Sequence, residues 1–188
     1  ATISSANAGS YTISNLTGIS IADGSGGAAS NYTLTGGTHN FTVNQRPLNA
    51  TLARQYDGTT ASAGSTLSSF DALQGGETLT MTGSGTAASA NVANGISVSS
   101  LGTLALVDGT GAASNYSLNS AVINVTQRPI SLSGTRLYDA TTNAVASDLS
   151  THANLVGSET LTLSGTGTIA SKDVGSNKTV SVGTLALG

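Results

Sequence analysis

The sequence has no cysteine, no tryptophan and only two prolines among its 188 residues. The absence of cysteine excludes a disulfide framework and any metal site built from thiolates. Aromatic residues make up only 4% of the chain, so a folded core has to come mainly from valine, isoleucine, leucine and alanine. No apolar run approaches the roughly 20 residues that a membrane-spanning helix requires, and we therefore expect no membrane insertion by this segment.

Charged residues are also scarce, at 8% of the chain, and the net charge is −3. The six basic residues are scattered, so no patch could neutralise several phosphates, and we expect no nucleic-acid partner. Low charge and 24 glycines are typical of some disordered chains as well as of strand-rich ones. Apolar residues that alternate regularly with polar ones favour an ordered, strand-rich protein.

The chain repeats itself with a period of about 82 residues. The stretch QRPLNATLARQYDGTT begins at Gln45, and QRPISLSGTRLYDATT begins at Gln127. At the same spacing, GGETLTMTGSGT recurs as GSETLTLSGTGT, and SVSSLGTLAL recurs as TVSVGTLAL with one residue deleted. A period of this length exceeds that of most solenoid repeats and suits a small domain.

A second element places the boundaries of the copies. GAASNYTL begins at Gly27 and GAASNYSL at Gly111. We therefore predict the C-terminal part of a first repeat at 1–44, a complete repeat at 45–126 and the N-terminal part of a third repeat at 127–188. On this prediction the sequence is a segment of a longer protein.

Period-2 alternation between turn clusters predicts an all-β fold. In ETLTMT, Leu79 and Met81 point to one side and the threonines to the other, as in a half-buried strand. Asn-Gly and Asp-Gly dipeptides separate such segments, and about seven short strands in each copy favour tandem small β-sandwiches of the Ig-like kind. A parallel β-solenoid is the second alternative, and SSFDALQGG, at 68–76, is the one expected helical turn.

The order of the repeated elements resembles a known family. QYDGTT and LYDATT are followed by GETLTMTG and GSETLTLSG, by KDVGSNKTVSV in the third copy, and by GAASNYSL in the complete one. This succession resembles the YDG repeat domain, which occurs in arrays in very large bacterial surface proteins similar to filamentous haemagglutinin and other two-partner-secreted adhesins. One departure is Ala140, which stands where the family has glycine and suggests that this turn residue need not adopt positive φ.

The resemblance implies an extracellular or cell-surface location and a structural role. It implies a stalk or fibre segment of an adhesin or biofilm matrix protein, without enzymatic activity. Neighbouring repeats would be its partners, other copies could associate laterally, and the sequence does not identify a host or matrix ligand. The alternative from another class is a carbohydrate- or ice-binding module that uses the threonine-rich strand faces of LTMTGSGT and LTLSGTGT.

The candidate site residues are those that recur in both copies. Opposite charges that recur together indicate pairing, and we expect an arginine to satisfy a carboxylate and to tie the YDG turn to a neighbouring strand. The residues of this structural motif are Tyr56, Asp57, Tyr138, Asp139, Arg54, Arg136, Glu77 and Glu159, with Arg46 and Arg128 as further candidates for the pairing.

Nothing in the sequence predicts a catalytic site, a cofactor or a metal. The two histidines, His39 and His152, occupy non-equivalent positions of the repeat, so no nucleophile–histidine set can recur. The DGSGG and DGTGA segments at Asp23 and Asp108 carry single carboxylates, too few for the six to eight oxygens that Ca²⁺ takes. We expect these two segments to be plain turns.

Asn-x-Ser/Thr sequons are the last candidate feature. Such sequons accept glycans on exported surfaces, and some adhesins of the resembling kind are glycosylated there. The candidate asparagines are Asn15, Asn31, Asn40, Asn49, Asn115, Asn124 and Asn177.

Overall fold

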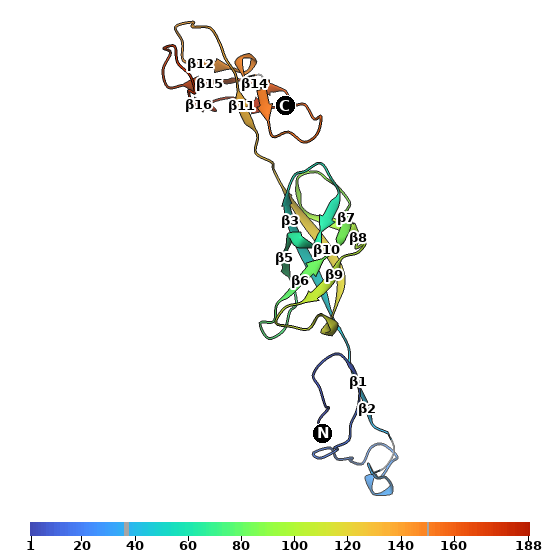
Figure 1. The fold of residues 1–188 in the computed structure, drawn as a ribbon. Coiled ribbons are helices and arrows are strands. Elements are labelled where there is room, and N and C mark those ends of the chain that lie inside the picture. The colour runs from blue at the N-terminus through green and yellow to red at the C-terminus, as the bar shows by residue number, and fades with distance from the viewer. Residues whose placement is uncertain (36–37, 150) are drawn as a thin grey trace. The chain divides into compact units, whose positions relative to one another are not determined.

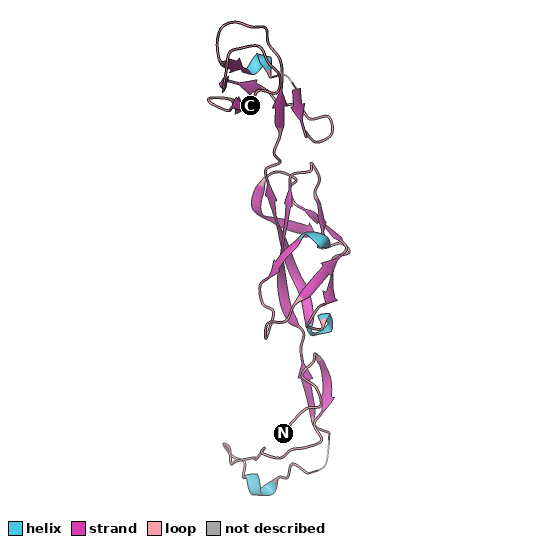
Figure 2. Cartoon of the chain, turned by 60° about the vertical axis from the view of Figure 1, so that its left-hand side comes forward, coloured by secondary structure: helices cyan, strands magenta, loops and turns pink. Residues whose placement is uncertain are grey.

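A computed structural model describes residues 1–35, 38–149 and 151–188, without the side chains of residues 151 and 152. In these residues the fold is all-β, with single-turn 3₁₀ helices at Ala29–Asn31, Gly64–Thr66, Ala113–Asn115 and Ala146–Asp148 (Figures 1 and 2). Within the described residues, no helix is long and apolar enough to cross a membrane.

The strands follow one another in short segments. They are β1 (Gly9–Thr12), β2 (Asn40–Val43), β3 (Arg46–Gln55), β4 (Ala61–Ala63), β5 (Leu67–Phe70), β6 (Leu79–Thr82), β7 (Ser84–Ala87), β8 (Ala93–Ser100), β9 (Ala105–Asp108), β10 (Tyr116–Thr126), β11 (Ser131–Ser133), β12 (Asn143–Val145), β13 (Thr151–Ala153), β14 (Leu163–Ser164), β15 (Thr166–Ile169), β16 (Val180–Ser181) and β17 (Ala186–Leu187).

The chain forms two compact units whose boundaries differ from those of the sequence repeats. Unit 1 comprises Ala1–Arg54, Thr60–Ser89 and Ala93–Asn124. Unit 2 comprises Gln55–Thr59, Ala90–Val92 and Val125–Gly188. The YDG turn of the complete repeat thus folds as part of the compact unit that is built mainly from the third repeat.

The complete repeat contains a six-stranded sheet and a two-stranded sheet. The large sheet has the order β4-β7-β8-β10-β3-β5, and β6 pairs with β9 antiparallel, with Leu79 opposite Asp108 and Met81 opposite Leu106. Along β6 the burial alternates as the sequence predicts, because Leu79 and Met81 are buried while Thr80 and Thr82 are exposed. Figure 1 shows β3 and β10 beside each other, with β6 and β9 in the same part of the fold.

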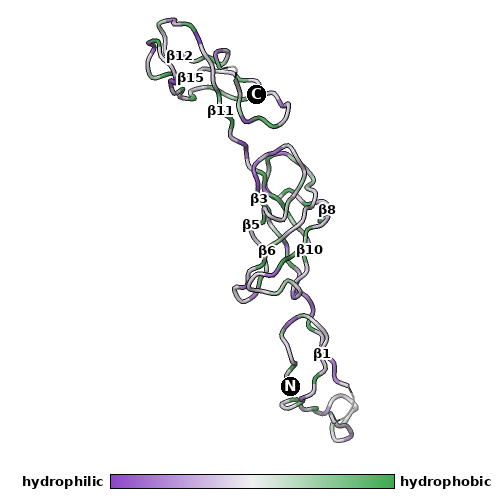
Figure 3. Tube along the Cα trace, viewed as in Figure 1, coloured by the Kyte–Doolittle hydropathy of each residue, from purple (hydrophilic) through white to green (hydrophobic). Residues whose placement is uncertain are grey.

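The core of this repeat is aliphatic and lies between the two sheets. Leu48 of β3, Leu79 of β6 and Tyr116 of β10 form one buried cluster, which joins the two sheets as in a sandwich. Leu52, Ile123 and Val125 are fully buried. Figure 3 shows hydrophobic residues recurring along β3 and β10, as expected for strands with one face on a core. The Ig-like character of the sandwich stays a prediction.

The third repeat reproduces the strand pairings of the complete one. Leu132 of β11 lies opposite residue 152 of β13, as Ala50 lies opposite Phe70, and Leu163 lies opposite Leu187, as Met81 lies opposite Leu106. Its sheets have the orders β11-β13, β12-β15-β16 and β14-β17.

One of the sequence-based expectations on the fold is revised. Residues 68–76 do not form a helical turn, because Leu67–Phe70 is strand β5 and the single-turn helix precedes it at Gly64–Thr66. Since β5 pairs antiparallel with β3, ladder hydrogen bonds override the weak helical tendency of this segment. The antiparallel registers also favour the sandwich over a solenoid, whose rungs would pair in parallel.

Candidate functional site

The YDG turn of the complete repeat is held by its aspartate. One carboxylate oxygen of Asp57 accepts hydrogen bonds from the main-chain N–H of Thr59, at 3.0 Å, and from its hydroxyl, at 2.9 Å. Gly58 lies between them with φ +75°, in the left-handed region. The motif therefore builds an Asx-type turn, in which aspartate replaces a backbone acceptor and glycine provides the left-handed residue.

The third repeat builds the same turn, and an ion pair supports it there. Asp139 accepts from the main-chain N–H and the hydroxyl of Thr141, both at 2.9 Å, and forms a salt bridge with Arg136. Arg136 also donates to the carbonyl oxygen of Thr141 at 2.6 Å. The N–H of Thr141, followed by the Arg136 guanidinium, holds the pKa of Asp139 below its ordinary value. In the complete repeat, Arg54 is the strand residue at the position of Arg136.

The expectation that Ala140 avoids positive φ is wrong. Its φ is +62°, close to that of Gly58 at the equivalent position. The hydrogen bonds from Thr141 to Asp139 impose the turn geometry on whichever residue lies between them. An L-residue in this region is strained by about 1–2 kcal/mol, so the turn, and not the glycine, determines the backbone here.

The two recurring glutamates accept hydrogen bonds from tyrosine hydroxyl groups. Within the complete repeat, the Tyr116 hydroxyl donates to Glu77 and accepts at 3.3 Å from the N–H of Gln74. In unit 2, the hydroxyl of Tyr56 donates to Glu159. The hydrogen bond to the carboxylate raises the pKa of each tyrosine, with Glu77 as the main cause for Tyr116 and Glu159 for Tyr56.

The equivalent of Tyr56 in the third repeat has different surroundings. Tyr138 is more than half exposed, and the ammonium group of Lys172 lies 5.8 Å from the centre of its ring. The tyrosine of the YDG motif is therefore half-buried in the complete repeat and exposed in the third one.

The arginines at the start of each copy bind main-chain carbonyl groups. Arg46 donates through Nε to the carbonyl of Ala72, and Arg128 donates through Nε to the carbonyl of Asn154, at 2.7 and 2.8 Å. These carbonyls occupy equivalent positions of the repeat. Each arginine thus ties the start of its copy to the segment that follows β5 or its counterpart β13.

The sequence analysis did not predict the hydrogen-bonded pair of Asn49 and Asp71. Asp71 accepts from the main-chain N–H and the side-chain amide of Asn49, at 2.9 and 2.6 Å, and the former lowers the pKa of Asp71 most. The third repeat has Ser131 and Ala153 at these positions. Since Asn49 and Asp71 are both replaced in the third repeat, a comparison of the two copies could have indicated that these residues are in contact.

The sequon asparagines fall into two groups. In Asn49 and Asn115, both the nitrogen and the oxygen of the side-chain amide form hydrogen bonds. The amide nitrogen of Asn115 donates to Asn7 at 3.1 Å, and its oxygen accepts from the N–H of Ala8 at 2.8 Å. The second group is Asn15, Asn31, Asn40, Asn124 and Asn177. In this group the side-chain oxygens of Asn15 and Asn124 accept the main-chain N–H groups of Thr17 and Gly95, both at 2.8 Å.

The remaining candidate residues have plain structural surroundings. Asp23 and Asp108 accept the main-chain N–H groups of Ala29 and Ala113, at 2.6 and 2.7 Å, beside the short helices that follow. The described residues contain no group of three metal-ligating side chains. His39 contacts the carbonyl of Leu34 at 3.2 Å, whereas the side chain of His152 lies outside the described residues.

The threonine row of β6 is one strand wide. Thr80 and Thr82 lie opposite Val107 and Ala105 of β9, so apolar residues and not further threonines flank the row. A flat grid of hydroxyl groups would need threonines on several adjacent strands.

These features define a class of protein: an all-β chain of tandem repeats whose recurring polar residues hold turns and strands in place. The YDG domain family matches the chain twice in succession, at residues 42–123 and 123–188. The chain therefore belongs to the YDG domain family. No curated protein and no solved structure matches it significantly.

Proposed function

We propose that this chain is a structural segment of a stalk or fibre, without enzymatic activity, in an extracellular bacterial adhesin or biofilm matrix protein. The observation that carries the proposal is the interlocking of consecutive copies. The turn Gln55–Thr59 of the complete repeat belongs to the compact unit of the third repeat, where the Tyr56 hydroxyl binds Glu159 and the N–H of Tyr56 donates to the carbonyl of Thr126 at 2.9 Å.

The roles of the recurring residues support the same function. The aspartates, glutamates and arginines of the motif bind main-chain groups, a tyrosine or each other within single compact units. A tandem array that has to resist extension benefits from such contacts, because each unit then includes residues from two copies of the sequence. Repeats that contact their neighbours in this way gain stability from the interfaces as well as from their own cores.

Two-partner secretion, surface exposure and lateral association extend this proposal. Their support is the resemblance of the repeated sequence elements to those of bacterial surface proteins. The carbohydrate- or ice-binding alternative gains nothing from the threonine row, since that row is flanked by Val107 and Ala105.

Single-molecule force spectroscopy tests the mechanical role. Pulling the full chain between its two ends should give a main unfolding event for the complete repeat. A repeat of 82 residues extends by at most roughly 27–30 nm, from which the length of the folded repeat is subtracted. Unfolding at forces no higher than those of ordinary non-mechanical β domains would contradict a load-bearing role.

Immunolabelling of intact, non-permeabilised cells tests the location. An antibody raised against the chain should label the outside of cells that make the whole protein, and mild protease treatment should remove the signal. Labelling only after permeabilisation would contradict the proposed location while leaving the mechanical result unaffected.

A further inference from the structure

One Asn-Gly dipeptide occurs in the sequence, at Asn94 and Gly95. Such a pair can modify itself, because the main-chain nitrogen after an asparagine can attack the carbonyl carbon of the asparagine side chain, which makes asparagine a thermolabile residue. Glycine makes the attack easiest, since it has no Cβ atom to hinder the approach and adopts backbone angles that other residues avoid. The surroundings of the pair therefore decide how fast it reacts.

The surroundings of this pair are open to solvent. Asn94 and Gly95 lie near the start of β8, and residues 91–95 are all exposed. Gly95 has φ +67°, and a Cβ atom there would have no neighbour within 4 Å. Among the described residues, no hydrogen bond holds the side chain of Asn94. Water therefore reaches both the asparagine side chain and the space around the reacting nitrogen.

One hydrogen bond restrains the reacting nitrogen. The main-chain N–H of Gly95 donates to Oδ1 of Asn124, on β10, at 2.8 Å. The attack requires this N–H to lose its proton and the nitrogen to turn toward the side chain of Asn94. Both changes cost more while a fixed acceptor holds the proton. Asn124 is half-buried and lies between the fully buried Ile123 and Val125 in the sequence, so the core of the sheet fixes this acceptor.

We propose that Asn94 is a self-modification site of the complete repeat, and that Asn124 is the positioning residue that sets its rate. In the first step, the nitrogen of Gly95 forms a bond to Cγ of Asn94 and the bond from Cγ to Nδ2 breaks. The proton of the N–H leaves with the amide nitrogen as ammonia, and a five-membered succinimide ring remains. In the second step, one water molecule opens the ring at either carbonyl group and gives aspartate or isoaspartate at position 94.

Other sequences that could form the same ring are held more firmly. Asn119 precedes Ser120, which is also small, but its side-chain nitrogen donates to Oδ1 of Asn49 at 3.0 Å. The aspartates of the three Asp-Gly pairs accept main-chain N–H groups through their carboxylates. An ionised carboxylate also resists attack by a nitrogen. Asn94 is therefore the site at which this chain reacts first.

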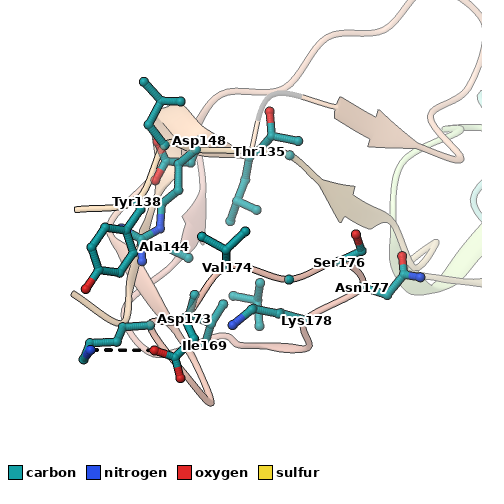
Figure 4. Close-up of a pocket in the computed structure, with 17 residues that line it drawn as sticks. Thr135, Tyr138, Ala144, Asp148, Ile169, Asp173, Val174, Ser176, Asn177 and Lys178 are labelled. Atoms are coloured by element: carbon teal, nitrogen blue, oxygen red, sulfur yellow. Dashed lines mark ion pairs between the residues drawn. The ribbon is translucent and has the colours of Figure 1, made fainter. Parts of the chain in front are cut away.

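The third repeat has the same backbone conformation without the reactive pair. SKDVGSNKTVSV aligns with SANVANGISVSS, so Ser176 and Asn177 take the positions of Asn94 and Gly95. Asn177 has φ +54° and thus keeps the left-handed conformation of Gly95. Figure 4 shows the side chains of Ser176, Asn177 and Lys178 on this segment. Since lysine and not glycine follows Asn177, the third repeat provides an internal comparison in which the reaction is slow.

Conversion of Asn94 changes strand β8. Either product adds a negative charge to the exposed start of the strand, and isoaspartate also adds one carbon atom to the main chain before Val98. Val98 lies opposite Ala87 of β7. A longer main chain cannot keep both this register and the hydrogen bond from Gly95 to Asn124. Older chains should therefore show faster amide hydrogen exchange at residues 93–98. This proposal does not depend on the stalk function, because the reaction needs only the chain and water.

Incubation of the full chain at slightly alkaline pH, followed by peptide mapping, tests the modification site. Mass spectrometry and enzymatic methylation of isoaspartate measure the conversion of each asparagine. We expect Asn94 to convert before the other asparagines of the complete repeat, but more slowly than in a synthetic peptide of residues 89–100. Gly95→Asn, which introduces the residue of the third repeat, should slow the conversion about tenfold. No conversion at Asn94, or conversion no faster than at Asn119, would overturn the proposal.

Two substitutions of Asn124 distinguish its hydrogen bond from a general loosening of the fold. Asn124→Val removes the acceptor and should raise the rate at Asn94 about fivefold, the effect of one hydrogen bond, while the rate at Asn119 stays unchanged. Asn124→Asp keeps an oxygen acceptor and should hold the rate at or below that of the parent chain. Equal acceleration at Asn94 and Asn119 in Asn124→Val, or equal rates at Asn94 in the two variants, would overturn the role of Asn124.

Discussion

The hydroxyl of Tyr56 donates a hydrogen bond to Glu159, a residue 103 positions further along the chain. The glutamate nearest to Tyr56 in its own copy is Glu77, which is occupied by Tyr116. The tyrosine of the YDG motif thus acts beyond its own copy, on the carboxylate of the next one.

Tyr56→Phe should loosen the third repeat and leave the complete repeat unchanged. The substitution keeps the ring but removes the donor to Glu159, so we expect faster amide hydrogen exchange at residues 155–161. Tyr116→Phe should have its effect at residues 74–79, where the hydroxyl contacts Glu77 and Gln74. Tyr138→Phe is the control at the equivalent position of the motif. Unchanged exchange at residues 155–161 in Tyr56→Phe would show that the hydrogen bond does not stabilise unit 2.

Equivalent core substitutions should have unequal costs in the two copies. Leu48 is fully buried in the cluster with Leu79 and Tyr116, so Leu48→Ala should lower the free energy of unfolding of the complete repeat by about 3 kcal/mol. Ile130 occupies the same position in the third repeat but is only half-buried, and Ile130→Ala should cost about 1 kcal/mol. Denaturant unfolding monitored by residue-resolved NMR measures both values, and equal costs would contradict the difference in burial between Leu48 and Ile130.

Ala140→Gly should stabilise the third repeat by about 0.5–1 kcal/mol. Ala140 has φ +62°, and glycine removes the strain of a Cβ atom in the left-handed region at some cost in chain entropy. The reverse change, Gly58→Ala, should destabilise, because a Cβ atom there would lie 2.8 Å from Cγ1 of Val156. Thermal melts of the two variants beside the parent chain decide the point; a lower midpoint for Ala140→Gly would contradict this interpretation of the turn.

The YDG turn of the third repeat should lose stability in acid. The pKa of Asp139 in the folded chain is lowered from 3.8 by the N–H of Thr141 and by Arg136. Its contribution is therefore complete above pH 3.8 and is lost as the pH falls through the lower, folded-state pKa. Carbon-detected NMR titration should find the Asp139 carboxyl titrating below pH 3.8. Arg136→Gln should raise that pKa, and an unchanged titration in this variant would exclude the ion pair as a cause.

Asn49 and Asn115 should remain without glycans even where the other sequons are modified. Modification of Asn49 would break its hydrogen bond to Asp71, and modification of Asn115 would break its hydrogen bond to Asn7. Glycopeptide mass spectrometry of the protein from an N-glycosylating host measures the occupancy of each sequon. Glycans on Asn49 in the folded protein would contradict the Asn49–Asp71 pairing.

The all-β fold followed from the sequence because the alternation of apolar and polar residues is a local signal. In β6, Leu79 and Met81 mark the buried face unambiguously. The sequence did not predict the left-handed φ of Ala140, because the two hydrogen bonds to Asp139 determine it and the residue type does not. The segment at 68–76 was assigned incorrectly for a related reason, since its pairing partner β3 is distant in sequence.

Recurrence identified the residues of the site and some of their partners. Tyr56, Asp57, Glu77 and Glu159 could be selected because they occur in both copies, and opposite charge suggested an arginine for one of the carboxylates, as in the pair of Arg136 with Asp139. Opposite charge could not indicate that the glutamates accept from tyrosines, because a hydroxyl group carries no formal charge. Tyr116 lies 39 residues from Glu77, so only the three-dimensional arrangement brings them together.

The pairing of Tyr56 with Glu159 has a consequence for how a gene of this kind changes length. The unit of duplication is the 82-residue copy, but the hydrogen bond joins two successive copies. Recombination that inserts or removes complete copies preserves every such hydrogen bond inside the array. Each inserted copy brings a tyrosine that can donate to the glutamate of the next copy, and a glutamate that can accept from the tyrosine of the preceding copy. An insertion of only part of a copy leaves a glutamate without its tyrosine donor at the point of insertion. Selection on the folded protein therefore favours changes in length by complete repeats.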